Sequence, residues 1–149
     1  MIGFYAGIRI MADLWSVFDY EVQMFRDLMN LCRGNMRLTF PPPIPNAITE
    51  SLVLHTRILT CVLISRGRAD DIKLETLLPG FTMPEIDILK TLYGKDDDPK
   101  SICWTLNKRL AHATAIRADS DGHDYGGSVQ TLRPFIEYIL GEVEKVRPR

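Results

Sequence analysis

A short helical segment in the second half of the chain concentrates four polar residues. Residues 105–114 include Asn107, Lys108, Arg109 and His112. Lys108 and Arg109 precede His112 by four and three residues, spacings that place side chains on one face of a helix. Neighbouring cations disfavour the imidazolium, so we expect a neutral ring near physiological pH. Such a ring can move a proton while the cations stabilise a developing oxyanion, which is chemistry suited to phosphate.

The same residues have a second interpretation as an ordinary, solvated basic face of a helix. Asn107 lies five residues before His112, which is about 140° around an ideal helix. The two side chains therefore point in different directions in a straight helix. The pattern leaves both interpretations open.

A second histidine occupies an apolar position in another helical segment. His55 lies on the apolar stripe of residues 50–59 and is predicted to point inward. The favoured interpretation is a neutral core histidine hydrogen-bonded to a backbone group or a hydroxyl. The alternative is a histidine that faces an open cleft, with Glu50 as a supporting residue. Glu50 and Arg57 lie on adjacent faces of this helix, and a structural salt bridge is the favoured role of each.

Other classes of site find no support in the sequence. His55, His112 and His123 form no His-x-x-x-His pair, and the acidic residues 119–124 lack a calcium-loop pattern with its closing glutamate. The chain also contains no Gly-x-Ser-x-Gly turn and no glycine loop that would cradle a phosphate before a helix. We therefore expect no metal and no cofactor.

The overall composition is typical of one globular domain. The chain has 149 residues, 46% of them hydrophobic and 25% charged, with a formal net charge of −1. This charge argues against a protein that binds nucleic acid non-specifically. Cys32, Cys61 and Cys103 stand apart among apolar residues, which indicates buried thiols in a reducing cytoplasm. No apolar run approaches membrane-spanning length, so we expect no membrane association.

Apolar residues recur at helical spacing along most of the chain. From Asp13 to Cys32, residues at intervals of three and four form one stripe. Further helices are predicted at 47–66, 84–93, 99–117 and 128–145, with Asn46, Pro84 and Asp98-Pro99 as start signals. The prediction is an all-α bundle of four long helices and one short helix. The domain is expected to span residues 13–146, with residues 1–12 as an N-terminal extension that has no structural role.

Three segments together carry a resemblance to known proteins. They are residues 50–59 (ESLVLHTRIL), 68–72 (RADDI) and 107–114 (NKRLAHAT). Over about residues 45–117 the chain resembles a group of small bacterial helical proteins and, more distantly, the HEPN superfamily of four-helix bundles. Many HEPN domains are metal-independent ribonucleases that dimerise so that two motifs meet in a cleft. Others have lost cleavage and act as binding or toxin–antitoxin modules.

The HEPN motif matches this chain in part. HEPN domains carry an arginine, often followed by a polar residue, and a histidine four to six residues later. His112 matches that histidine and Asn107 the polar residue, whereas Leu106 stands where the arginine would be. The departure removes the cation that would orient the scissile phosphate, unless Lys108 or Arg109 substitutes for it.

Two functional hypotheses follow from these observations. The first is a non-catalytic interaction module in stress or phage defence, which forms a homodimer through apolar helix faces and binds a protein partner. The second is a metal-independent ribonuclease, or an RNA- or nucleotide-binding protein, in which a ribose 2′-hydroxyl attacks its own phosphate. Its catalytic residues would be His112, Lys108 and Arg109, supported by Asn107, Glu50 and His55.

Overall fold

The computed structural model describes residues 2–33, 39–41, 43–111 and 125–148. These residues form helices and no strand, which confirms the all-α prediction. The helices are α1 (Ile2–Cys32), α2 (Ile44–Leu63), α3 (Leu74–Leu77), α4 (Pro84–Tyr93), α5 (Ile102–Ala111) and α7 (Tyr125–Val146).

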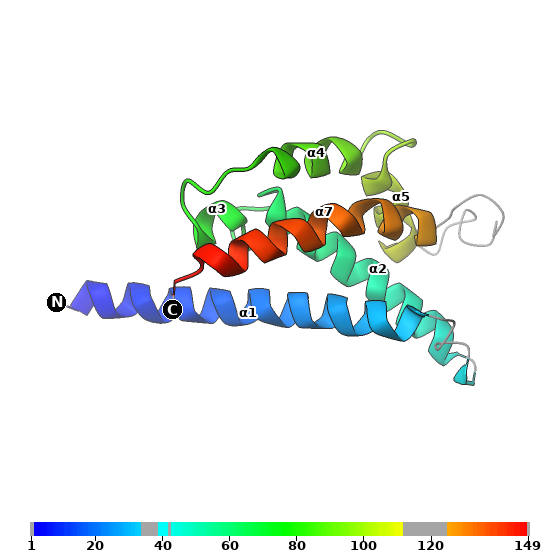
Figure 1. The fold of residues 1–149 in the computed structure, drawn as a ribbon, viewed down its shortest axis with the longest axis horizontal. Helices are drawn as coiled ribbons and strands as arrows, with labels where there is room; N and C mark the ends of the chain where they lie inside the picture. The colour runs from blue at the N-terminus through cyan, green and yellow to red at the C-terminus, as the bar shows by residue number, and fades with distance from the viewer. Residues whose placement is uncertain (1, 34–38, 42, 112–124, 149) are drawn as a thin grey trace.

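Helix α2 is the centre of the arrangement. It contacts α1, α4, α5 and α7, and its contact with α1 is the most extensive in the fold. In Figure 1, α1 and α4 lie at opposite edges of the view, with α2 and α7 between them. Polar groups on α2 and on the loop after it can therefore meet groups from several other helices.

The predicted apolar stripes form the core. Leu132, Ile136, Ile139 and Val143 of α7 are all buried, as the periodicity of that segment predicts. On α1, the stripe from Trp15 to Met29 is buried as well. Each fully buried large side chain contributes roughly 1.5–3 kcal/mol relative to an exposed one, so these stripes dominate the packing energy.

Ion pairs join the two ends of the chain outside the core. Arg147 donates from both terminal nitrogens to the Asp19 carboxylate, at 2.6 and 2.8 Å, and its guanidinium lies 4.5 Å from the centre of the Trp15 ring. Arg26 of α1 reaches Glu137 and Glu144 of α7. These contacts fix α7 along α1.

The start of α2 differs from the prediction. The helix begins at Ile44, and Asn46 lies inside it and makes no cap. Pro45 is accommodated in the first turn, where backbone N–H groups have no partner within the helix and a proline loses nothing. The helix therefore begins one residue before the last proline of residues 41–45 (PPPIP).

The start of α5 also differs from the prediction. Asp98 accepts a hydrogen bond from the Lys100 N–H at 2.9 Å and so closes a turn instead of capping the helix. The Ser101 hydroxyl caps α5, because its oxygen accepts from the Trp104 N–H at 3.0 Å. Consequently the helix begins at Ile102 and not at about residue 99.

Two helices begin earlier than predicted, and one short helix was not predicted. Helix α1 begins at Ile2, ahead of Asp13, since residues 2–12 contain no proline to stop it. Helix α7 begins at Tyr125 instead of 128. Helix α3 was missed because its single turn, anchored by two buried leucines, is too short to show a period. The side chains of residues 2–12 are outside the described part, so the proposed lack of a structural role for them stays a prediction.

Candidate functional site

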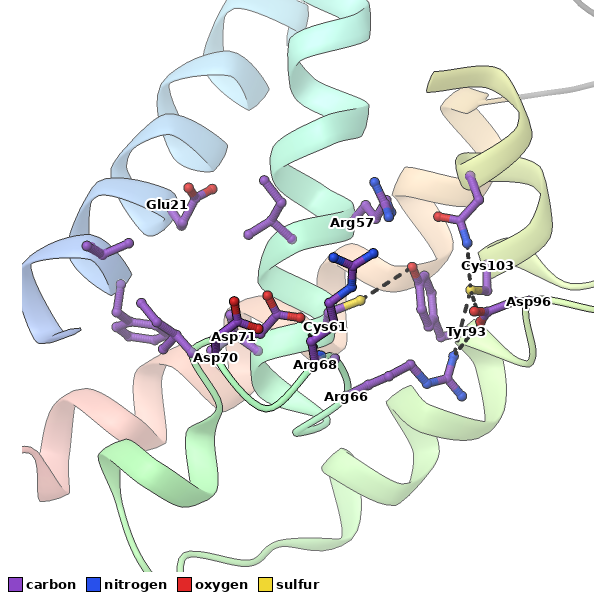
Figure 2. Close-up of a pocket in the computed structure, with 17 residues that line it drawn as sticks. Glu21, Arg57, Cys61, Arg66, Arg68, Asp70, Asp71, Tyr93, Asp96 and Cys103 are labelled. Carbon is purple, nitrogen blue, oxygen red and sulfur yellow. Dashed lines mark hydrogen bonds and ion pairs between the residues drawn. The ribbon is translucent and has the colours of Figure 1, made fainter. Parts of the chain in front are cut away.

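A pocket of about 780 Å³ opens beside the C-terminal half of α2. Its walls come from α1, α2, the loop after α2, the end of α4 and the start of α5 (Figure 2). Its charged lining residues are Glu21, Arg57, Arg66, Arg68, Asp70, Asp71 and Asp96. The pocket therefore contains both positive and negative side chains. What it can bind depends on which of these side chains already have a partner within the protein.

The three segments that carry the resemblance meet at this pocket. Arg57 belongs to the first segment, Arg68 and Asp70 to the second, and Asn107 to the third, and all four line the pocket. Segments separated by tens of residues thus supply one site. Arg57 of α2 and Asn107 of α5 therefore line the same pocket.

The turn that ends α2 places the following loop at the pocket. Ser65 takes the left-handed conformation, with φ of 51°. Its N–H donates to the Val62 carbonyl at 3.1 Å, and the Arg66 N–H donates to the Cys61 carbonyl at 2.8 Å. These paired bonds are those of a Schellman motif, which ends a helix abruptly. The helix therefore ends at Leu63, ahead of the end predicted at residue 66.

Asp71 holds the loop in a tight turn. Its carboxylate oxygen Oδ2 accepts from the Arg68 N–H at 2.6 Å. Gly67 has φ of 139°, and a Cβ there would lie 2.4 Å from that same oxygen. Only glycine fits this conformation without displacing Asp71.

Arg66 joins this loop to the end of α4. Its Nη1 donates to the Gly94 carbonyl at 2.7 Å and lies 3.7 Å from Asp96 Oδ1. The guanidinium also lies 5.4 Å from the centre of the Tyr93 ring. Arg66 is therefore part of the frame of the pocket, and its charge is matched by Asp96.

The thiols and the phenol in the pocket are held in their protonated forms. The Tyr93 hydroxyl lies 3.7 Å from Cys61 Sγ, and burial raises the pKa of both groups. Burial, together with the hydrogen bond that it donates to Asp96, raises the pKa of the Cys103 thiol to about 11. A thiol needs its thiolate form to act as a nucleophile, so neither cysteine is activated for catalysis.

Two arginines in the pocket are not engaged. The side chains of Arg57, which is half-buried on α2, and of exposed Arg68 form no hydrogen bond or ion pair with any residue that the structure describes. The structural salt bridge predicted for Arg57 is therefore not found among these residues. Both are drawn without a dashed line in Figure 2, whereas Arg66 carries one. Guanidinium groups that line a pocket without a partner are suited to bind an anion.

Asn107 presents an unused acceptor to the same pocket. The Cys103 thiol gives its proton to Asp96 at 3.1 Å, so its sulfur accepts from Asn107 Nδ2 at 3.4 Å. That contact fixes the orientation of the amide. Asn107 Oδ1 is buried and has no hydrogen-bond partner among the described residues. An unsatisfied buried acceptor costs about 1–3 kcal/mol, which a ligand donor would recover.

His55 points inward, as predicted, but its partner is different. The ring is buried, and Nδ1 lies 2.6 Å from Glu21 Oε2 of α1. The prediction of a backbone or hydroxyl partner was therefore wrong. His55 itself does not line the pocket, whereas Glu21 does. Glu50 is exposed on α2 and is also outside the pocket lining.

The remaining predicted site residues are only partly described. The backbones of Lys108 and Arg109 continue α5 directly after Asn107. Their side chains, and the whole of His112, lie outside the described residues. The catalytic roles assigned to these three residues therefore stay predictions.

One of the pocket residues that sequence reasoning missed carried a visible signal. Glu21 lies three residues after Phe18 and four before Phe25, both of which are buried. A carboxylate at that spacing stands on the apolar face of its helix and needs a buried partner. By contrast, Tyr93 and Asp96 gave no signal, because only the turn after α4 brings them to the pocket.

No family model, curated protein or solved structure matches the chain. Within the described part, no helix is long and apolar enough to cross a membrane. The described residues also contain no group of three or more His, Cys, Asp or Glu side chains that could hold a metal ion. The functional proposal therefore rests on the pocket itself.

The raised pKa of Cys103 predicts a loss of stability at alkaline pH. The pKa is 9.0 for an ordinary cysteine and about 11 here, so the folded state holds the proton more tightly. This contribution is complete below pH 9.0 and is lost as the pH rises to about 11. We expect urea unfolding of Cys103→Ser to show a shallower decline over this range. Parallel pH profiles for the two proteins would contradict the assignment.

Proposed function

We propose that this protein is a non-catalytic binding module whose pocket holds a small ligand by its anionic group. The observation that carries the proposal is the pair Arg57 and Arg68, whose guanidinium groups have no hydrogen-bond or ion-pair partner among the described residues that line the pocket. Guanidinium groups form short, paired hydrogen bonds with phosphate and carboxylate oxygens. A volume of about 780 Å³ leaves room for such a group and for a body attached to it.

The partners of the charged side chains in the pocket support an anionic ligand. Glu21 faces His55, Asp71 accepts the Arg68 backbone N–H, and Asp96 accepts the Cys103 thiol. Among the described carboxylates of the pocket, that leaves Asp70 without a partner. The lining as a whole holds three arginines and four carboxylates, so its net charge is not positive. The support for an anion is that two guanidinium groups lack a partner among the described residues, against one carboxylate.

The frame around these arginines supports binding with little rearrangement. The loop that carries Arg68 is fixed at one end by the Ser65 turn and within by Asp71. Arg57 projects from the central helix α2. Because this backbone is in place before binding, a ligand has to order only the two arginine side chains, so more of the interaction energy becomes affinity.

The ribonuclease hypothesis remains the second candidate, with one specific observation in its favour. Asn107, which matches the polar residue of the HEPN motif, lines this pocket. In that case the ligand is RNA, and His112, Lys108 and Arg109 perform the proton transfer and bind the phosphate. The HEPN-like bundle, the homodimer, and the role in stress or defence belong to the same level of proposal.

Binding of inorganic pyrophosphate tests the proposed site. We expect pyrophosphate to raise the melting temperature of the protein in a saturable way. Arg57→Gln and Arg68→Gln should each weaken binding by about tenfold or more, because each removes a charge-assisted hydrogen-bond donor. Arg133→Gln, on α7 and outside the pocket lining, makes the same change of charge and serves as the control. Equal weakening in all three variants would show that only net charge matters.

RNA cleavage in EDTA separates the two candidates. A non-catalytic module leaves a single-stranded RNA intact, and His112→Ala changes nothing. Cleavage by the wild-type protein that disappears in a folded His112→Ala variant would replace the binding proposal with the ribonuclease. The fold of the variant is checked by circular dichroism.

A further inference from the structure

The unused acceptor in the pocket identifies a second requirement on the ligand. One N–H of Asn107 Nδ2 donates to Cys103 Sγ, and Oδ1 is the buried atom that has no partner among the described residues. An acceptor of this kind binds an N–H or O–H group and discriminates strongly against a ligand that lacks one, because the buried oxygen then stays unpaired. The ligand therefore carries a hydrogen-bond donor as well as an anionic group.

The two requirements lie on different walls of the pocket. The arginines come from α2 and its following loop, whereas Asn107 comes from α5. The lining also includes the apolar side chains of Ile58, Val62 and Ile72. A molecule that fits has an anionic end, an apolar body and a donor on that body. A bare inorganic anion is much smaller than a site of about 780 Å³, which is in the range of sites for molecules of drug size.

The two unpartnered guanidinium groups favour phosphate over carboxylate as the anionic end. Arg57 and Arg68 together offer two positive charges with no partner in the described structure. A phosphate monoester carries about −1.5 to −2 near pH 7, whereas a carboxylate carries a single negative charge. Phosphate also presents enough oxygens for two guanidinium groups at once. Asp70, which has no partner among the described residues, offers an acceptor for hydroxyl groups.

We infer that the ligand is a nucleoside monophosphate whose base donates an N–H to Asn107 Oδ1 and whose phosphate lies on Arg57 and Arg68. The flat base is the apolar body, and the ribose hydroxyls lie within the part of the pocket that Asp70 lines. The inference rests on the proposed function, since it assigns a ligand class to the same site. It requires no chemical step and no metal.

Calorimetric titration with matched ligands tests this inference. The probes are AMP, GMP, CMP and UMP, each of which has an N–H donor on its base, and purine riboside 5′-monophosphate, which has none. We expect at least one of the four to bind about tenfold more tightly than purine riboside 5′-monophosphate. In Asn107→Ala this preference should disappear, whereas Asn107→Asp, which keeps an acceptor, should retain part of it.

The outcomes separate the two levels of proposal. If pyrophosphate binds but none of the four nucleotides binds more tightly than purine riboside 5′-monophosphate, the inference is wrong and the anion site stands. If neither pyrophosphate nor any nucleotide binds, both proposals fail. The ligand comparison uses the wild-type protein, so it decides the question even where an Asn107 variant does not fold. An Asn107→Ala variant that folds and keeps the full preference would also overturn the role of Asn107.

Discussion

The abrupt end of α2 is the constraint on which the pocket depends. Ser65 in the left-handed conformation turns the chain away from the helix axis, and two backbone hydrogen bonds seal that turn. The chain after the turn brings Arg66 and Arg68 to the pocket. There Arg66 reaches the Gly94 carbonyl and the Asp96 carboxylate, which closes one side of the pocket. The cost of a non-glycine residue in this conformation is about 1–2 kcal/mol, which the motif must offset.

The same network explains why some polar groups remain available. Arg66, Asp96 and the Cys103 thiol satisfy one another, and Asn107 contributes its amide nitrogen to them. The contact with Cys103 Sγ orients the Asn107 amide, and Oδ1 is left without a partner among the described residues. A pocket with a rigid, satisfied frame and a few unsatisfied groups inside it is organised for a ligand.

The sequence was most informative where local rules decide the structure. Apolar periodicity predicted the buried face of α7, and the start signal at Pro84 with the break at Gly94 predicted the bounds of α4. Local signals predicted the wrong partner where a side chain could reach several polar groups. Asp98 caps a turn instead of α5, and His55 binds a carboxylate on another helix. The pocket as a whole could not be predicted, because its arrangement depends on contacts between distant segments.

The most direct test of the account is nuclear magnetic resonance of the arginine side chains during titration with pyrophosphate. The Nε–Hε signals report on each guanidinium separately, with assignments from arginine-to-lysine variants. The account predicts that the Arg57 and Arg68 signals shift together along one saturable curve, while that of Arg66, already engaged with Gly94, moves little. Small shifts of all the arginines that grow linearly with ionic strength would contradict an anion site in this pocket.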